Sequence, residues 1–278
     1  MSEKNPTVSI VIEPNRVQKE YLKDLFRYRE LFYFFAWRDI IVRYKQAFFG
    51  VAWALFRPLL NMIVFTFVFS RMANLSSENV YYPLFVLAGL LPWQLFACSL
   101  SETCLSLLNH SHLISKIYFP RIIIPSSLVV VHLLDFSIGL LFMLVLALCM
   151  GALSFSTILC LPFFIGLAVM LCVGASLWLS ALTVQFRDFR FIVPFVVQCG
   201  MFVSPVGYGS FIVPETWRWF FYLNPMVGII DGFRWSLFGS TYAGIGVSIA
   251  VSAVLTTCIM VSGFLYFRKT ERSFADHI

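Results

Sequence analysis

Two ionisable residues, His132 and Asp135, lie one helical turn apart inside a long run of apolar residues. Ionisable side chains at membrane depth are costly, and they are therefore candidates for function. The two residues could form a proton relay, or they could be a mutually satisfied pair that holds helices together, and we favour the second interpretation. A further acid, Glu102, lies near the end of the preceding apolar run, where its carboxylate can reach water.

Motifs that bind nucleotides or perform catalysis are absent from the sequence. It contains no G-x-x-x-x-G-K-S/T for ATP phosphates, no G-x-S-x-G, no H-E-x-x-H and no calcium-binding loop. His110 and His112 alone are too few for a metal site, and the seven cysteines show no C-x-x-C spacing. We therefore expect no metal, no cofactor and no enzymatic activity in this chain, so that any energy source is a partner or an ion gradient.

The composition is that of a membrane protein. Of the 278 residues, 60 % are hydrophobic and only 12 % are charged, and the mean hydropathy is +0.85, which indicates a polytopic helical protein. The first thirty residues carry six basic side chains and no apolar core of signal-peptide length, so we expect the N-terminus to stay in the cytosol. The basic pI does not indicate nucleic acid, because the basic residues cluster beside apolar runs.

Six stretches approach the roughly 20 apolar residues that a membrane-spanning helix needs. They are 51–69, 83–104, 126–150, 155–183, 191–208 and 244–267. An even number of spans places both termini on one side of the membrane. We therefore predict an all-α integral membrane protein with six transmembrane helices. Its parts would be a cytosolic segment at 1–30, an amphipathic interfacial helix at 31–49 and a transmembrane domain at 50–278.

The basic residues are distributed unevenly between the two sides of this topology. Seventeen of the 20 Lys and Arg residues fall in the N-terminal part up to residue 57, in the second and fourth loops, or in the C-terminal tail. Only Arg71, Arg218 and Arg234 fall on the other side. The positive-inside rule therefore places both termini and the second and fourth loops in the cytosol.

The segment 31–49 has the spacing of an amphipathic helix. Apolar side chains recur every three or four residues at Trp37, Ile40, Ile41 and Tyr44, while the other face carries Arg38, Asp39, Arg43 and Lys45. Asp39 precedes Arg43 by four residues, which predicts a supporting ion pair. A helix with a cationic face and an aromatic face is typical of a membrane surface, where it lies in the plane of the membrane.

Two loops and two aromatic faces complete the pattern. The second loop, about 105–125, holds a helix-capable stretch that Pro120 ends, and it could bind a soluble partner or rest on lipid headgroups. The external segment, about 209–243, is rich in aromatic residues interrupted by prolines, which predicts short re-entrant helices that could plug or line an exit.

Aromatic side chains on single helical faces could be helix packing or a sliding surface for sugars and lipid tails. These side chains are Phe49, Trp53 and Phe56 in the first span, and Phe191, Phe195 and Phe202, joined by Gln198, in the fifth.

Several motifs in order resemble those of polysaccharide-export ABC transporter permeases. They are W-R-D-I-I-V-R-Y-K-Q from Trp37 with Gly50, Trp53 and Pro58, then F-V-L-A-G-L-L-P-W-Q-L-F from Phe85, K-I-Y-F-P-R-I-I-I-P from Lys116, V-Q-F-R-D-F-R-F from Val184 and Y-L-N-P-M-V-G-I-I-D-G-F-R-W from Tyr222. This resemblance covers nearly the whole chain after residue 30. It implies an exporter of lipid-linked O-antigen, capsule or teichoic acid in the bacterial plasma (inner) membrane. Two copies of the chain would pair with two ABC subunits, which bind the ATP and Mg.

The resemblance also implies roles for individual residues. Lys116, Ile117, Tyr118, Phe119 and Arg121 would form the coupling helix that docks on the ATPase. Trp217, Trp219 and Tyr222 would belong to the external gate helices, and the two aromatic faces would line the substrate path between the two copies. His132 and Asp135 would then be structural.

Two alternatives remain open from the sequence. A permease that exports drugs or small lipids would need no polymer-length tunnel. An integral-membrane glycosyltransferase or acyltransferase would instead use Asp135 and His132 in catalysis, and Asp135→Asn would abolish its activity without any ATPase present.

Overall fold

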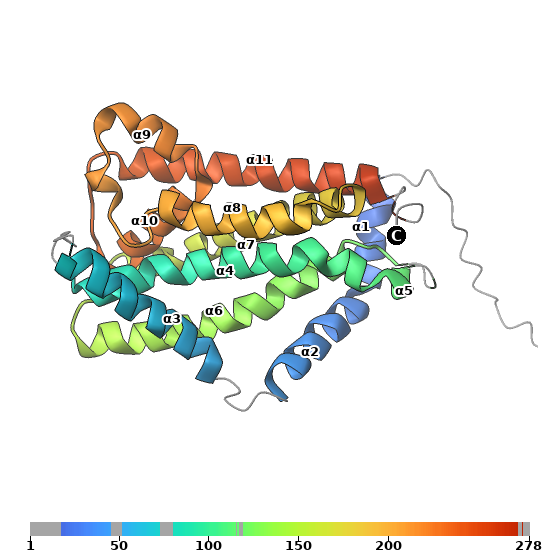
Figure 1. Cartoon of the computed structure of the whole chain (residues 1–278), viewed down its shortest axis with the longest axis horizontal. Coiled ribbons are helices and arrows are strands. Elements are labelled where there is room, and N and C mark those ends of the chain that lie inside the picture. The colour runs from blue at the N-terminus through green and yellow to red at the C-terminus, as the bar shows by residue number, and fades with distance from the viewer. Residues whose placement is uncertain are drawn as a thin grey trace, which may run out of the picture.

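The computed structural model describes residues 18–45, 52–72, 80–114, 116, 119–271 and 274, and within these ranges the side chains of 18–22 and 71–72 are left out. The described residues form helices and connecting turns without a strand. Figure 1 shows most of the long helices side by side along the longest axis of the molecule. The predicted all-α membrane fold is confirmed.

Five helices are long and apolar enough to cross a membrane. They are α3 (Ala52–Phe65) with the π-helical turn η1 (Thr66–Met72), α4 (Tyr82–Asn109), α6 (Ile123–Cys149), the short η2 (Ile158–Cys160) with α7 (Leu161–Gln185), and α11 (Ile245–Glu271). Their bounds lie within a few residues of five predicted spans. The agreement reflects the length of the apolar runs, which few soluble folds contain.

The fifth predicted span, 191–208, is shorter in the structure than expected. Its helix, α8 (Phe189–Val203), has 15 residues, which at 1.5 Å per residue gives about 22 Å, less than the ~30 Å hydrocarbon core. The helix ends where Ser204 takes an extended conformation and Pro205 follows. A proline cannot continue the hydrogen-bonded ladder, so the apolar run continues as irregular chain.

The long helices alternate in direction, so their connections gather at the two ends of the bundle (Figure 1). At one end, which we call the α5 end, lie α1 (Gln18–Arg27), α5 (Ser111–Ile114) and the last turn of α11. At the other, the α9 end, lie η3 (Ser210–Ile212), α9 (Glu215–Tyr222) and α10 (Pro225–Phe238). The second and fourth loops and the C-terminal end of α11, with their basic residues, therefore share the α5 end.

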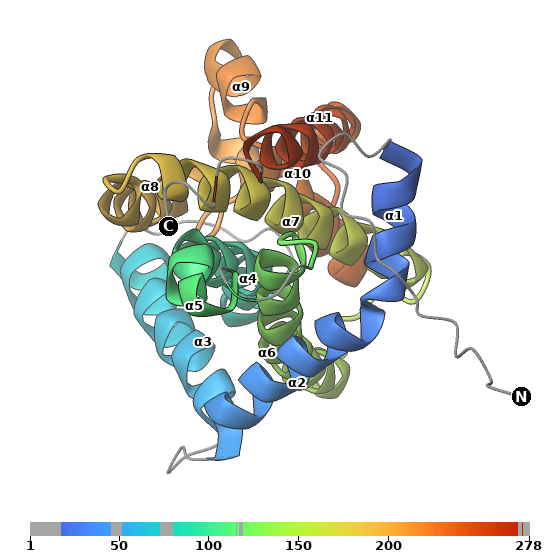
Figure 2. The same cartoon turned by 90° about the vertical axis from the view of Figure 1, so that its right-hand side faces the viewer.

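Helix α4 is the centre of the bundle. Figure 2 shows it surrounded by α3, α6, α7 and α8, and most of its residues are buried, among them Val86, Leu90 and Leu107. A helix that is apolar on all sides buries every face, whereas the other spans keep an exposed stripe.

Helix α10 packs inside the α9 end of the bundle against α4, α7 and α11. Asn224 caps its N-terminus by accepting a hydrogen bond from the Met226 backbone N–H at 3.0 Å, and Pro225 supplies the first turn. Gly239 ends the helix with a positive φ of 68°, a conformation that favours glycine. The N-P and terminal Gly of this segment thus define a short helix before the last span.

Candidate functional site

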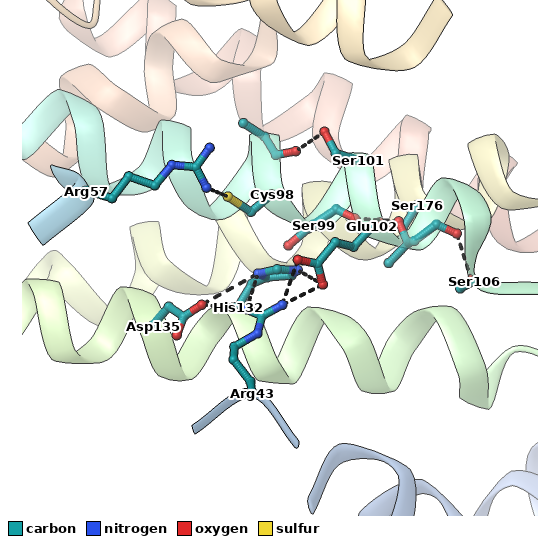
Figure 3. Close-up of polar contacts among 12 residues, drawn as sticks. Arg43, Arg57, Cys98, Ser99, Ser101, Glu102, Ser106, His132, Asp135 and Ser176 are labelled. Carbon is teal, nitrogen blue, oxygen red and sulfur yellow. Dashed lines mark hydrogen bonds and ion pairs between the residues drawn. The ribbon is translucent and has the colours of Figure 1, made fainter. Parts of the chain in front are cut away.

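An ion-pair network joins α2 (Arg29–Lys45) to the bundle (Figure 3). The Arg43 guanidinium lies 2.6 Å from Glu102 Oε2 on α4 and 2.7 Å from Asp135 Oδ2 on α6. His132 lies between the two acids, with Nε2 3.1 Å from Glu102 Oε2 and Nδ1 3.8 Å from Asp135 Oδ2. The Tyr44 hydroxyl donates a hydrogen bond to the Asp135 carboxylate. We call Arg43, Tyr44, Glu102, His132 and Asp135 the Arg43 network.

The network keeps its members on α2 in fixed protonation states. Burial acts to lower the pKa of Arg43, but the charges and hydrogen bonds of Glu102 and Asp135 outweigh it and raise that pKa above its ordinary value. Burial, followed by the hydrogen bond to Asp135, also raises the pKa of Tyr44. Arg43 is therefore charged and Tyr44 neutral near pH 7.

In the described part of the chain, no group of His, Cys, Asp and Glu side chains is arranged to hold a metal ion.

The predicted faces of α2 differ from those in the structure. Arg43 points into the bundle, while Trp37 is exposed and Phe35 and Ala36 are buried. The predicted pair of Asp39 with Arg43 is wrong, because Arg43 binds Glu102 and Asp135 whereas Asp39 binds Arg38 at 2.7 Å. Acids on distant helices compete for Arg43 more effectively than a neighbour on the same helix, because they hold it at a partly desolvated site.

A cavity of about 300 Å³ lies beside the Arg43 network. It is partly open, and residues of α2, α3, α4 and α6 line it. Beyond the network, its polar lining comes from Trp53, Arg57, Gln94 and Cys98. None of these four was predicted to lie near Asp135, because the sequence does not indicate which faces of separate spans meet.

The two predicted aromatic faces lie on the surface of the chain. Trp53 and Phe56 on α3 stack with ring centroids 5.7 Å apart and are at least half exposed. Phe191, Phe195 and Phe202 on α8 are exposed by 61–66 %, and Gln198 is exposed beside them. Both helices pack on α4, on the same side of the molecule in Figure 2. Phe49 lies outside the described residues.

The predicted coupling loop is anchored to neighbouring helices at the α5 end. Phe119 is buried and its ring lies 6.1 Å from that of Phe35. Arg121 donates from Nη1 to the Glu271 carbonyl at 2.9 Å, and its backbone N–H donates to the Glu271 carboxylate at 2.8 Å. Lys116 is exposed, whereas Ile117 and Tyr118 lie outside the described residues. The loop therefore contacts both α2 and the end of α11.

The predicted gate residues divide between surface and core. Trp217 and Trp219 on α9 are exposed, Trp219 by 70 %, whereas Tyr222 is 5 % exposed. Tyr222 lies against Gly244, where a Cβ would be 2.8 Å from the Tyr222 hydroxyl. Helix α9 thus presents tryptophans outward and is held to the start of α11 by its last residue.

Two buried charges on α10 were missed as a site from the sequence. Arg234 donates to the backbone carbonyls of Phe85, Val206 and Tyr208 at 2.8–3.2 Å, and Asp231 accepts from Ser210 and Tyr242. A guanidinium has five donors in a rigid fork, which suits three carbonyls from two separate segments. The charged residues inside the D-G-F-R-W run were the available signal.

A model of the family described as "ABC-2 type transporter" matches residues 30–238. The chain belongs to the ABC-2 type transporter family. The match begins within α2 and extends to the end of α10.

Relatives of this ABC-2 family member align over most of their length. The O-antigen export system permease protein RfbA of Klebsiella pneumoniae is 29 % identical over 242 residues, covering 86 % of this chain and 91 % of that protein. The RfbA of Myxococcus xanthus is 27 % identical, with 92 % and 98 % covered. The polysialic acid transport protein KpsM of Escherichia coli is 20 % identical, with 85 % and 92 % covered.

Proposed function

We propose that this chain is the membrane subunit of an ATP-driven exporter that moves a lipid-linked polysaccharide from the cytosolic to the outer face of the plasma membrane. The observation that carries the proposal is the near-full-length alignment with relatives named as O-antigen permeases, together with KpsM. An O-antigen, capsular polysaccharide or teichoic acid would be the cargo.

The proposed assembly contains two copies of this chain and two copies of an ABC subunit that binds ATP and Mg. The absence of a phosphate-binding motif from the sequence supports a separate ATPase. The α5 end faces the cytosol in this proposal, because the second and fourth loops and the end of α11 gather there with their basic residues. Both termini are then cytosolic, and the protein is multi-pass in the bacterial inner membrane.

Movement would begin at the coupling loop. ATP binding in the partner pushes on residues 105–125, and the contacts of Phe119 and Arg121 transmit the displacement to α2 and α11. The two permease subunits then move apart, and the exposed tryptophans of α9 move aside at the outer end. The glycan then slides between α3 and α8 of the two copies over aromatic rings, which offer stacking contact without a deep well.

Export in cells tests this function directly. A strain without the gene should lose its surface polymer, and the tagged protein should restore it and co-purify with an ABC ATPase. Trp53→Ala and Phe202→Ala should each slow export several-fold without dissociating the complex, because each removes an exposed ring from the proposed path. Unchanged surface polymer in both variants would contradict the lined path, and a null strain with normal surface polymer would contradict the export function itself.

A further inference from the structure

Two hydrogen-bond donor groups line the cavity beside the Arg43 network without an oxygen acceptor among the described residues. Arg57 donates a hydrogen bond from Nη1 to Cys98 Sγ at 3.4 Å (Figure 3), and it forms no ion pair with any described residue. The buried Nε2 of Gln94 has no hydrogen-bond partner among the described residues. Both residues line this one cavity, from α3 and α4 respectively.

The acceptors of the cavity wall, in contrast, are already occupied. Glu102 accepts both its hydrogen bonds from Arg43, at 2.6 and 2.7 Å, and Asp135 accepts from Arg43 and Tyr44. Arg43 supplies one positive charge to these two carboxylates, and Arg57 is the second arginine that lines the cavity. The groups left for a ligand are donors, one of them a full positive charge.

The position of Arg57, an exposed residue of α3, makes the lack of an oxygen acceptor costly. It lies in the membrane-span candidate Ala52–Ser70, five residues after Ala52, which is about 8 Å along the helix axis. Trp53 and Phe56 nearby on α3 are exposed, so the cavity adjoins the surface that meets lipid or a second copy. An arginine inside a span is expensive unless an anionic or polar group meets it there.

We propose that Arg57 and Gln94 bind a diphosphate group that is carried on a lipid. The guanidinium fork matches two oxygens of such a group, and the Gln94 amide supplies a further donor. The volume of about 300 Å³ suits a headgroup, since ligand sites usually measure about 300–1,000 Å³. The identification of this group as the linkage of an exported lipid-linked glycan rests on the proposed function.

Binding to the purified full-length chain in detergent tests the site without export or ATP hydrolysis. Farnesyl diphosphate is the probe. Farnesol, inorganic pyrophosphate and phosphatidylglycerol vesicles are measured beside it, because they carry the isoprenoid chain alone, the diphosphate alone and an ordinary lipid phosphate. We expect farnesyl diphosphate to bind, and Arg57→Gln to weaken it about tenfold or more, as loss of a charge-assisted hydrogen bond does. Gln94→Leu should weaken it by a smaller factor, and Arg57→Lys should retain part of the affinity, because charge remains while the fork is lost.

Arg190→Gln is the matched control, because Arg190 is also an exposed arginine near the start of a membrane helix but does not line the cavity. It should bind as the unmodified chain does, and thermal unfolding without ligand should show each variant folded. Equal binding by Arg57→Gln would overturn the site. Equal affinity for inorganic pyrophosphate, or for phosphatidylglycerol, would overturn the assignment to a lipid-borne diphosphate and leave a free anion or a bulk headgroup as the ligand.

The two proposals fail in distinguishable ways. If Arg57→Gln binds farnesyl diphosphate as well as the unmodified chain does, while the unmodified chain restores surface polymer in cells, the site is refuted and the export function stands. Intact Arg57-dependent binding in a protein that restores no surface polymer would retain the site and remove the export function.

Discussion

At the scale of single residues, Arg43 makes the contacts that hold α2 against the bundle. Its guanidinium reaches carboxylates on two other helices, Glu102 on α4 and Asp135 on α6. His132 lies between these acids, so the pair that the sequence suggested is part of a larger group. Removing the cation would leave two carboxylates next to each other at a partly desolvated position, and like charges at such a site repel.

Arg43→Ala should therefore lower the free energy of unfolding by about 1–3 kcal/mol, the cost of leaving charged partners unsatisfied. Thermal unfolding in detergent measures the change. Lys45→Ala is the control, since Lys45 is an exposed cation on the same helix and its removal should change stability little. A loss with Lys45→Ala equal to that with Arg43→Ala would show that helix charge, and not the network, is responsible.

Arg234 illustrates a different use of a guanidinium. Its donors satisfy the carbonyls of Val206 and Tyr208, where the chain leaves regular helix, and the carbonyl of Phe85 on α4. Its Cζ lies 3.6 Å from the ring centroid of Phe85. Gly89 makes room for it, because a Cβ there would lie 2.6 Å from Arg234 Nη2. Irregular backbone inside a membrane protein needs such partners, because no water is available to it.

At the scale of elements, the packing of α10 depends on close approach to its neighbours. A Cβ at Gly228 would overlap the Ser248 carbonyl oxygen of α11, and one at Gly232 would overlap the Phe164 ring of α7. The Gly228 backbone N–H also donates to Ser252 Oγ at 3.0 Å. Small residues at helix contacts are the usual means of close packing in membrane proteins.

Gly228→Ala should accordingly destabilise the fold by about 1–3 kcal/mol, because the overlapping atom belongs to backbone and cannot move aside. Gly166→Ala on α7 is a matched control, since a Cβ there would meet open space. It should be neutral or stabilising by about 0.5–1 kcal/mol. Chemical or thermal unfolding of both variants in the same detergent makes the comparison, and equal stability of the two would refute the close-packing argument.

At the scale of the whole molecule, the alternating directions of the spans bring the coupling loop to one end and α9 to the other (Figure 1). Lys116 and Glu215 are exposed at these opposite ends, the Glu215 side chain by 88 %. The two positions should therefore be accessible from opposite sides of the membrane.

Cysteine labelling checks this topology. In a variant without the natural cysteines, Glu215→Cys should react with an impermeant maleimide in intact cells, and Lys116→Cys only after the membrane is opened. Reaction of Lys116→Cys from outside would invert the proposed orientation, and with it the docking of an ATPase at the α5 end.

The sequence by itself determined the membrane class, five of the six spans and the grouping of basic loops. These features depend on the length of apolar runs and on the order of charges along the chain, which are local or additive properties. It overestimated the span at α8, because the apolar run from Phe191 continues past Pro205.

Only the tertiary structure decided which side chains meet. Glu102 and Asp135 lie 59 and 92 residues from Arg43 in the sequence, and yet both contact it. Arg57 and Gln94 likewise line one cavity that neither of their helices forms alone. Helical periodicity indicates which residues share a face of one helix, but not which face of another helix it contacts. That choice depends on the packing of all helices together, because each contact is one of several that the same apolar surfaces would permit.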